Sequence, residues 1–385
     1  MDIKIPLSTP CLTGKELDYI KECLDSGWVS STGPFVKRFE DAFAHYVGAQ
    51  YAVAACNGTA ALHLALLAGG VQPGDEVLVP TITFAATINV VHYCNAVPVF
   101  FDCDQDFNLD LDGVERFISE KCRTVGGRLF NTLTGRPIWG IIPVHVFGNP
   151  VDMTRLMALA RVHGLTVVED AAEALGSSHA NQHAGTFGTF GCFSFNGNKI
   201  ITTGGGGMVV TDSCEMATKI RYLSTQAKDD GLRFIHNEVG YNYRLTSIQA
   251  AMGTAQLEAL PEFLVRKKAI HRRYVEGFAD ISDVQVRTPA SEGISNHWIT
   301  NISLRSNCSR DALGLITKLT ESGIEARPLW YPNHLQRPNK DFPSFEISRA
   351  LGEVSQTVSL PSSVHLQDAD QTYVIQEVIR ILGAP

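Results

Sequence analysis

The sequence of 385 residues predicts an α/β fold built on a mostly parallel mixed sheet with flanking helices. Short apolar runs alternate with helical segments along the first half of the chain, which is typical of parallel βαβ units. From residue 246 the pattern becomes helical and more charged, which indicates a second unit. We therefore expect a large domain over residues 1–253 and a smaller α+β domain over residues 254–385.

The composition limits the classes of function that this chain can serve. A hydrophobic content of 44% and a charged content of 19% are ordinary for a globular protein. The net charge of −8, without a basic cluster, speaks against nucleic acid as a partner. No apolar run approaches the roughly 20 residues that a membrane span needs. Residues 1–6 lack the apolar core of a signal peptide, so we expect a cytoplasmic protein.

Apolar periodicity gives the elements of the large domain in order. A helix is predicted over residues 13–24, with a cap at Thr13 and an apolar face of Leu17, Ile20 and Leu24. A loop over 27–34 leads to a second helix over 35–47. Strands follow at 51–56, 76–80, 97–102, 138–146, 165–169, 192–195 and 208–211. One helix follows the first of these strands and ends near residue 68. Three more helices cover 84–93, 110–121 and 153–162.

The remaining segments are assigned in the same way. A long helix over 246–278 leads into the small domain, which continues with a strand over 298–304 and helices over 312–321 and 367–382. Residues 122–136 are mostly polar and have no clear period. We therefore expect an exposed insertion there.

The cysteines and histidines do not indicate a disulfide framework or a metal site. The nine cysteines are scattered, odd in number and without a Cys-x-x-Cys pair, which favours reduced thiols in the cytosol. His179 and His183 are four residues apart, but the glycines and serines around them predict a loop. Such a pair shares a metal only on a helix, so we expect no metal.

A lysine and an upstream acid carry the strongest chemical signal. Lys199 ends the segment Phe193-Ser194-Phe195-Asn196-Gly197-Asn198-Lys199, and Asp170 ends a predicted strand 29 residues earlier. A lysine amine can form a Schiff base with an aldehyde cofactor. An aspartate near the ring nitrogen of that cofactor keeps the nitrogen protonated and makes the ring an electron sink. Lys199 and Asp170 therefore predict pyridoxal phosphate (PLP) chemistry, with both as catalytic residues.

Further residues could bind such a cofactor. The turn Gly58-Thr59-Ala60 opens a helix, where free N–H groups and a hydroxyl bind anions, and Ser194 could add a second phosphate donor. Phe84 could stack on a planar ring, and Glu173 could hydrogen-bond a ring hydroxyl. Each also has an ordinary structural explanation, as a helix cap, a strand serine, a core aromatic or a surface acid.

Six motifs together resemble those of the DegT/DnrJ/StrS sugar aminotransferases, which have the type I fold of PLP-dependent transferases. The resemblance covers nearly the whole chain. The motifs are Ser26-Gly27-Trp28 with Gly33-Pro34, residues 57–62, residues 80–87, Glu169-Asp170-Ala171-Ala172, residues 193–199, and Gly240-Tyr241-Asn242-Tyr243-Arg244.

The resemblance implies a role for each matching position. Lys199 would be the Schiff-base lysine, Asp170 the partner of the pyridine nitrogen and Phe84 the stacking aromatic. The positions that match phosphate contacts are Thr59, Ala60 and Ser194. Asn242 matches a residue that reaches the phosphate of the neighbouring subunit, which implies a homodimer with shared active sites. Glu173 stands where the family often has Gln or His.

Three shorter segments resemble the sequences of one branch of the family, the LegC/PglE-type enzymes. The segments concerned are residues 195–203, 296–298 and 330–334. The resemblance implies transfer of an amino group from L-glutamate, which becomes 2-oxoglutarate, to C4 of a UDP-linked 4-keto-6-deoxy-N-acetylglucosamine. A GDP-perosamine synthase is the alternative, because those enzymes are similar in much of the sequence of these segments. Trp28, Tyr331 and His334 are the candidate substrate contacts.

Other questions stay open at the level of sequence. No pattern distinguishes UDP from GDP or fixes the stereochemistry of the new amine. A PLP-dependent sugar dehydratase would have histidine at the position of Lys199. A regulatory protein that binds PLP without catalysis is the alternative from another class, and the presence of all the reactive residues speaks against it.

Overall fold

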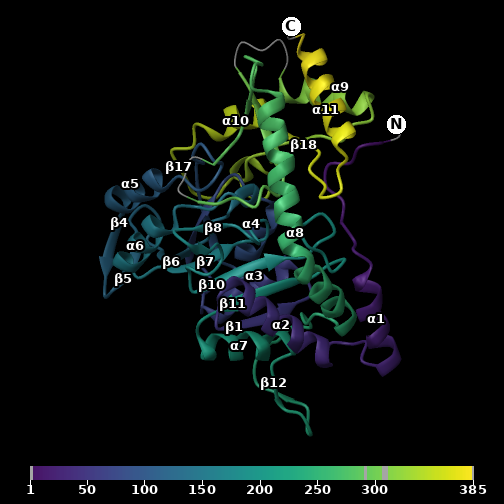
Figure 1. Cartoon of the computed structure of the whole chain (residues 1–385). Helices are drawn as coiled ribbons and strands as arrows, with labels where there is room; N and C mark the ends of the chain where they lie inside the picture. The colour runs from purple at the N-terminus through teal and green to yellow at the C-terminus, as the bar shows by residue number, and fades with distance from the viewer. Residues whose placement is uncertain (1–2, 290–292, 306–310, 384–385) are drawn as a thin grey trace.

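The computed structural model describes residues 3–289, 293–305 and 311–383. Within these residues, a ten-stranded sheet forms the centre of the larger part, and its main path runs β1-β11-β10-β7-β6-β2-β3-β17 (Figure 1). Pairing is parallel from β10 through β7, β6, β2 and β3 to β17, and antiparallel at β1–β11–β10. The mostly parallel mixed sheet expected from the sequence is confirmed.

The strands of this sheet are short and close to the predicted positions. Their bounds are β1 (Tyr51–Ala55), β2 (Glu76–Pro80), β3 (Val97–Phe101), β4 (Cys122–Val125), β5 (Arg128–Asn131), β6 (Pro137–Ile141), β7 (Thr166–Asp170), β10 (Phe190–Ser194), β11 (Gly207–Thr211) and β17 (Ser344–Phe345).

Alternate residues of each strand enter different cores, because successive side chains of a strand point to opposite faces. Ala52 and Ala54 of β1 pack in one core, and Val53 and Ala55 pack in another. In the same way, Val167 and Val168 of β7 lie in separate cores. The sheet is therefore covered on both faces, as expected of a largely parallel sheet.

Helices supply that cover. They are α1 (Lys15–Ser26), α2 (Pro34–Val47), α3 (Gly58–Ala68), α4 (Ala85–Tyr93), α5 (Leu111–Lys121), α6 (Met153–His163), α7 (Cys214–Ser224) and the long α8 (Ser247–Gly277). Side chains cap several N-termini: Asn57 accepts from Ala60 N at 2.8 Å, Asp152 caps α6, and Thr246 forms a capping box on α8. α3, α4 and α7 share one core, and α2 and the start of α8 share another.

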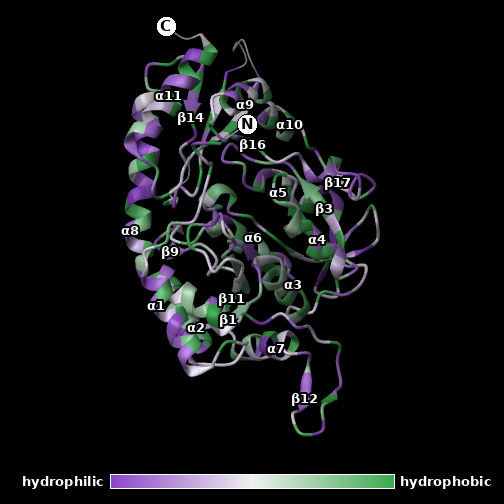
Figure 2. Ribbon diagram, turned by 90° about the vertical axis from the view of Figure 1, so that its right-hand side faces the viewer, coloured by the Kyte–Doolittle hydropathy of each residue, from purple (hydrophilic) through white to green (hydrophobic). Residues whose placement is uncertain are grey.

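The smaller part has an antiparallel sheet of its own, in the order β14-β15-β18-β16. Its strands are β14 (Val284–Val286), β15 (Thr300–Leu304), β16 (Arg327–Pro328) and β18 (Thr357–Leu360), and its helices are α9 (Ala312–Glu321), α10 (Ala350–Gln356) and α11 (Asp368–Leu382). Figure 2 places α9, α10, α11 and β14 together at one end of the molecule, with α8 running between the two parts.

The helix α8 contributes residues to the core of the large sheet and, further along, to the core of the small sheet. Phe263 packs in a core of the large sheet, whereas Ile270 and Tyr274 pack in the core of the small sheet. Ile5 also belongs to that second core and pairs with Ile324. The division of the chain at residues 253 and 254 stays a prediction.

Four expectations about elements need correction. Residues 122–131 form the hairpin β4–β5, which extends the large sheet through β6, because a polar hairpin lacks the apolar alternation that reveals a strand. The strand expected over 138–146 ends at Ile141, and a short 3₁₀ turn covers Val146–Gly148. The cap of α1 is Gly14 and not Thr13. Leu17 and Leu24, expected on a buried face of α1, are 71% and 58% exposed.

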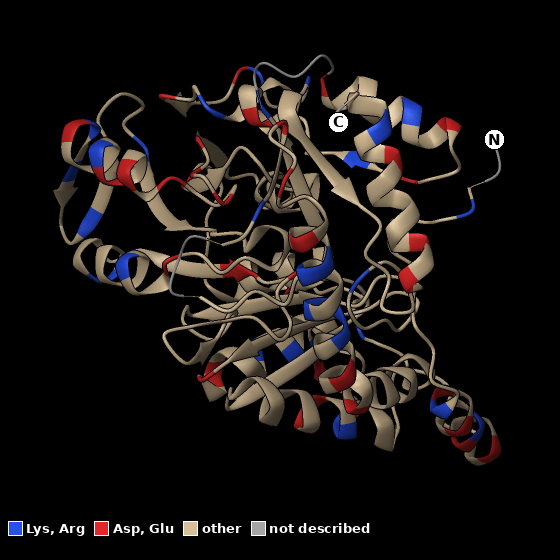
Figure 3. Cartoon of the chain, turned by 45° about the horizontal axis from the view of Figure 1, so that its top comes forward, with Lys and Arg blue, Asp and Glu red and all other residues tan. Residues whose placement is uncertain are grey.

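Short hairpins complete the fold. β8 (Ser178–His179) pairs with β9 (Gln182–His183), and β12 (Lys228–Asp230) pairs with β13 (Ile235–His236). The second hairpin projects from the body of the molecule in both Figures 1 and 2. Acidic and basic residues are interspersed over the helices in Figure 3. Within the described ranges, no helix is long and apolar enough to cross a membrane.

Candidate active site

A cavity lies where the carboxyl ends of the parallel strands meet the smaller part of the molecule. The sheet supplies one wall, through side chains that follow the strands β1, β2, β6, β7 and β10: Thr59, Thr83, Phe84, Val144, Asp170 and Ser194. The loop after β10 brings in Asn198 and Lys199, and segments further along the chain supply the other wall: Trp298 and Trp330. The carboxyl edge of an open α/β sheet is the usual place for an active site.

The turn between β1 and α3 forms an anion-binding cup. As the first residues of a helix, Gly58 and Thr59 have N–H groups without intrahelical acceptors. Ser194 closes the cup from β10, so tightly that a Cβ atom added at Gly58 would lie 2.8 Å from the Ser194 Cβ. Glycine is required here because the two strand ends approach so closely.

Asp170 lies at the end of β7 and is only 6% exposed. Its carboxylate accepts hydrogen bonds from Thr87 Oγ1 at 2.7 Å and from Ala172 N at 3.2 Å. Burial raises the pKa of Asp170, against the opposing effect of these bonds and of the Lys199 charge. A buried acid of this kind gains from a cationic partner.

Lys199 reaches the same cavity from a loop after β10. Its Nζ donates to Glu173 Oε1 at 3.1 Å and lies 4.2 Å from the centroid of the Trp298 ring. The other oxygen of Glu173 accepts from Phe147 N at 2.9 Å. Burial also raises the pKa of Glu173, which the nearby Lys199 charge opposes. The ammonium of Lys199 is therefore held between a carboxylate and an aromatic face.

Most of the residues predicted from the sequence meet at this cavity. Gly58, Thr59, Phe84, Asp170, Glu173, Ser194 and Lys199 all line it, and Phe84 is 62% exposed. Ala60 follows in the first turn of α3 and its N–H is already bound to Asn57 Oδ1.

Besides Ala60, four predicted residues are not among those that line the cavity of this chain. Asn242 is exposed on a segment that pairs with Thr225. Trp28 and Tyr331 are 48% and 52% exposed. His334 is half-buried against Thr81, with Nδ1 at 2.6 Å from Thr81 Oγ1, and burial lowers the pKa of this histidine.

Several residues of the site escaped the sequence reasoning. Thr87, the hydroxyl partner of Asp170, stands three residues after Phe84 on the same helix, a spacing that places both near one strand end. Trp298 comes from 99 residues beyond Lys199, and no local pattern connects the two. The aromatic loop around Trp330 and Tyr331 was expected to line a sugar or base pocket, and Trp330 does line the cavity.

A buried pair also supports the strand that carries Asp170. Val151 N donates to His145 Nδ1 at 3.1 Å, so the proton lies on Nε2, which donates to Glu169 Oε2 at 3.0 Å. Glu169 also accepts N–H bonds from Gly185, Phe187 and Gly188. This network fixes the end of β7 without entering the cavity.

Residues 10–379 match the DegT/DnrJ/EryC1/StrS aminotransferase family. The chain belongs to this family. Its members are PLP-dependent sugar aminotransferases. In this chain the side chains of Lys199 and Asp170 line one cavity. The type I fold of PLP-dependent transferases, expected from the resemblance, is confirmed.

Similar members of the family are known from sequence and structure. The chain is 38% identical to GDP-perosamine synthase of Caulobacter vibrioides, over 98% of each chain. It is 37% identical to GDP-perosamine synthase of Escherichia coli O157:H7, over 97% of each chain. A solved family aminotransferase from Brucella abortus shares 30% identity and a TM-score of 0.86, over 96% of each chain. DesI with its TDP-sugar product shares 28% identity and a TM-score of 0.87, over 99% of this chain and 94% of DesI.

Proposed function

We propose that this enzyme transfers the amino group of L-glutamate to C4 of a nucleotide-linked 4-keto-6-deoxy sugar, with Lys199 and Asp170 as its catalytic residues. One observation carries the proposal: the Lys199 amine and the buried Asp170 carboxyl face a single cavity that also contains a helix N-terminus. A cofactor with an aldehyde, a basic ring nitrogen and a phosphate matches these three features.

The residues present fit PLP. The cup of Gly58, Thr59 and Ser194 would hold the phosphate, and Phe84 would cover the ring. A protonated ring nitrogen would give Asp170 the cationic partner that burial favours. When bound, PLP supplies an electron-withdrawing ring that stabilises negative charge on the reacting carbon.

The chain itself would move the protons. When it is not bound to the cofactor, the Lys199 amine would accept the proton of the reacting carbon and return one. Glu173 Oε1 at 3.1 Å would hold Nζ in place between the two transfers. Asp170, supported by the Thr87 hydroxyl, would keep a proton on the ring nitrogen.

The names of the relatives favour a GDP-linked sugar. From the sequence we expected the UDP-linked N-acetylated sugar first and the GDP-linked sugar of a perosamine synthase as the alternative. The matching relatives of Caulobacter vibrioides and Escherichia coli O157:H7 are GDP-perosamine synthases. We therefore place the alternative ahead of the UDP-linked sugar, with the C4 ketone common to both.

The substrate assignment is tested with the purified enzyme in its pyridoxamine phosphate form. UDP- and GDP-linked 4-keto-6-deoxy sugars are added separately, and the return of the absorbance band of the lysine-bound cofactor is followed. Return with the GDP sugar alone supports the perosamine-type function. Return with the UDP sugar alone would restore the first expectation, and return with neither would remove the C4 assignment.

We also propose a homodimer in which Asn242 completes the phosphate site of the partner subunit. Asn242 is exposed and does not line the cavity of its own chain, which suits a contact across an interface. The hairpin β12–β13 extends from the body with Leu232 87% and Phe234 69% exposed. Together with Leu17 and Leu24 of α1, these apolar side chains are suited to burial against a second copy.

Subunit mixing tests the shared site. Lys199→Ala and Asn242→Ala subunits, each severely impaired alone, are allowed to exchange. Activity should return in part, because one of the two sites in a mixed dimer receives both intact residues. Absence of rescue, with subunit exchange verified by mass spectrometry, would count against the shared site.

A further inference from the structure

Trp298 contacts the Lys199 segment at two points. Its Nε1–H donates to the carbonyl oxygen of Asn198 at 2.8 Å, one residue before the lysine. The face of its ring lies 4.2 Å from the Lys199 Nζ. A single indole therefore holds both the backbone at the base of this lysine and the nitrogen at its end.

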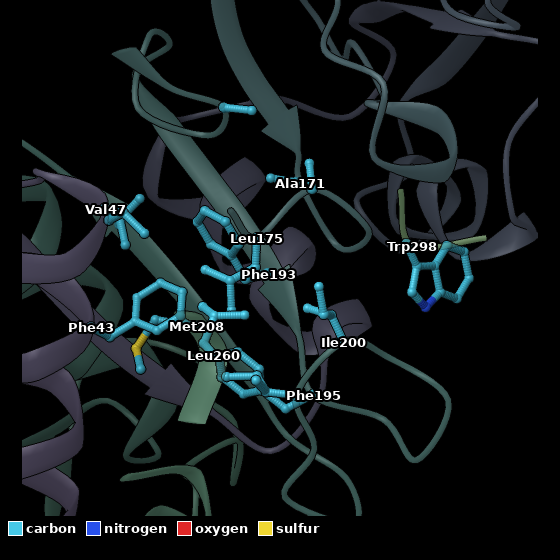
Figure 4. Packing of buried hydrophobic residues seen from close by; sticks show 14 of the residues in the cluster. Phe43, Val47, Ala171, Leu175, Phe193, Phe195, Ile200, Met208, Leu260 and Trp298 are labelled. Carbon is cyan, nitrogen blue, oxygen red and sulfur yellow. The ribbon is translucent and has the colours of Figure 1, made fainter. Parts of the chain in front are cut away.

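Trp298 is itself fixed from several directions. Its main-chain N–H donates to Asn296 Oδ1 at 2.9 Å, and its carbonyl oxygen accepts from the buried Lys267 Nζ at 2.7 Å. Its ring stacks on Phe147, with centroids 6.2 Å apart and 28° between the planes. Figure 4 shows the indole standing apart from the phenylalanines of the sheet core. A side chain held in this way can act as a rigid support.

A lysine at this position needs such a support. A lysine side chain loses much rotamer freedom when it is held in one conformation. Among the described residues, Lys199 Nζ donates to the carboxylate of Glu173, and one such contact leaves the four-carbon chain free to pivot. A ring face removed from water attracts a cation through the quadrupole of its π-system. The two contacts together define one position for Nζ.

We infer that Trp298 is a positioning residue that holds the Lys199 amine where it meets the cofactor aldehyde. The inference rests on the proposed role of Lys199 as the cofactor-binding lysine. Trp330 provides a matched comparison, because it lines the same cavity and stacks on the same Phe147 at 4.9 Å. Among the described residues, the ring found over Lys199 Nζ is that of Trp298 and not that of Trp330.

The test measures capture of the cofactor by the apo-enzyme. PLP is mixed with the wild type and with the variants Trp298→Leu, Trp298→Phe and Trp330→Leu. Borohydride is added after increasing times, and label on the Lys199 peptide is measured by mass spectrometry. We expect Trp298→Leu to slow capture by about tenfold or more, and Trp330→Leu to slow it clearly less, because its ring does not lie over Lys199 Nζ. Trp298→Phe keeps a ring but loses the bond to Asn198, so its rate should be intermediate.

A second ligand separates positioning from general damage to the cavity. Pyridoxamine phosphate has the phosphate and the ring but no aldehyde, so its affinity should change by less than about threefold in Trp298→Leu. Capture by Trp298→Leu at the wild-type rate would overturn the inference. Equal slowing in Trp298→Leu and Trp330→Leu would also overturn it, since both would then act through packing alone.

Failure of the inference is distinguishable from failure of the proposed function. If wild-type enzyme places no label on Lys199, the proposed function is wrong and the role of Trp298 falls with it. If wild type is labelled and the variants are not slowed, only the positioning role is wrong. Should Trp298→Leu fail to fold by circular dichroism, Trp298→Phe decides, and an unchanged capture rate in that variant contradicts the inference.

Discussion

The two walls of the cavity are held in different ways. On the sheet side, Asp170 is fixed through the backbone, since its N–H donates to Pro143 O at 2.9 Å and β7 pairs with β10 beside it. On the opposite side, the backbone of Trp298 is held by side chains: its N–H donates to Asn296 Oδ1, and its carbonyl oxygen accepts from Lys267 Nζ. Substitutions on the sheet side should therefore change the rate of the chemical step or the affinity for the cofactor. Substitutions on the opposite side should change the position of the Lys199 amine.

The largest effect is expected from the lysine that lies between the two walls. Lys199→Ala should abolish transamination and leave the fold and the phosphate cup intact, because the lost amine is both the cofactor ligand and the proton carrier. Activity is measured with L-glutamate and the 4-keto sugar, and affinity for pyridoxamine phosphate serves as the control. A variant that still forms a borohydride-reducible adduct with PLP would show that another lysine has this role.

Asp170→Asn tests the sheet wall next. The amide keeps the size of the side chain and the bond from Thr87, but it cannot balance the charge of a protonated ring nitrogen. We expect PLP to remain bound and turnover to fall by at least about tenfold, or about 1.4 kcal/mol of barrier. Turnover close to wild type would mean that Asp170 does not have this role.

Gly58→Ala probes the anion cup on the same wall. The added Cβ would lie 2.8 Å from Ser194 Cβ and 3.1 Å from its Oγ, so the cup must open. Affinity for pyridoxamine phosphate should fall by about tenfold. Gly197→Ala is the matched control, since a Cβ added there meets nothing within 4 Å, and its affinity should match wild type. Equal affinities in the two variants would contradict the assignment of the cup.

The same contrast explains what the sequence could and could not predict. Asp170, Ser194 and the turn at 58–60 stand directly at strand ends, where apolar runs stop and reactive side chains begin. Their roles in binding and catalysis remain predictions until tested in solution. Trp298 was missed as part of the site because its contact with Lys199 joins segments 99 residues apart, and such pairings leave no local pattern.

Errors in the elements have similar causes. The hairpin β4–β5 pairs through its backbone while much of its outer surface is polar and exposed, so its sequence lacks an apolar alternation. The periodicity of α1 correctly gave a helix but not its buried side, which contains Glu16 and Cys23. Periodicity shows that an apolar face exists, and it does not say whether the same chain or a partner covers it.

The smallest effect on the active site is expected from Lys267, whose Nζ donates to the backbone of Trp298. Lys267 is 2% exposed, and its Nζ donates to the carbonyl oxygens of Trp298 and Ser362. Burial lowers the pKa of Lys267 to about 7, whereas the unfolded chain has a lysine pKa of about 10.4. Between these values the unfolded chain binds the extra proton, so the stability contributed by this group rises with pH, by up to about 1.4 kcal/mol per pH unit.

Lys267→Met removes the titrating amine and, with it, the hydrogen bonds to the carbonyl oxygens of Trp298 and Ser362. The free energy of unfolding is measured by urea denaturation at pH 7, 8 and 9. As the pH rises, the free energy of unfolding of the wild type should increase relative to that of the variant. Lys268→Met, at the exposed neighbouring position, is the control and should follow the wild-type curve. Parallel curves for wild type and Lys267→Met would mean that Lys267 does not lose its proton on folding. If capture of PLP is also slowed in Lys267→Met and not in Lys268→Met, the support behind Trp298 contributes to the position of Lys199.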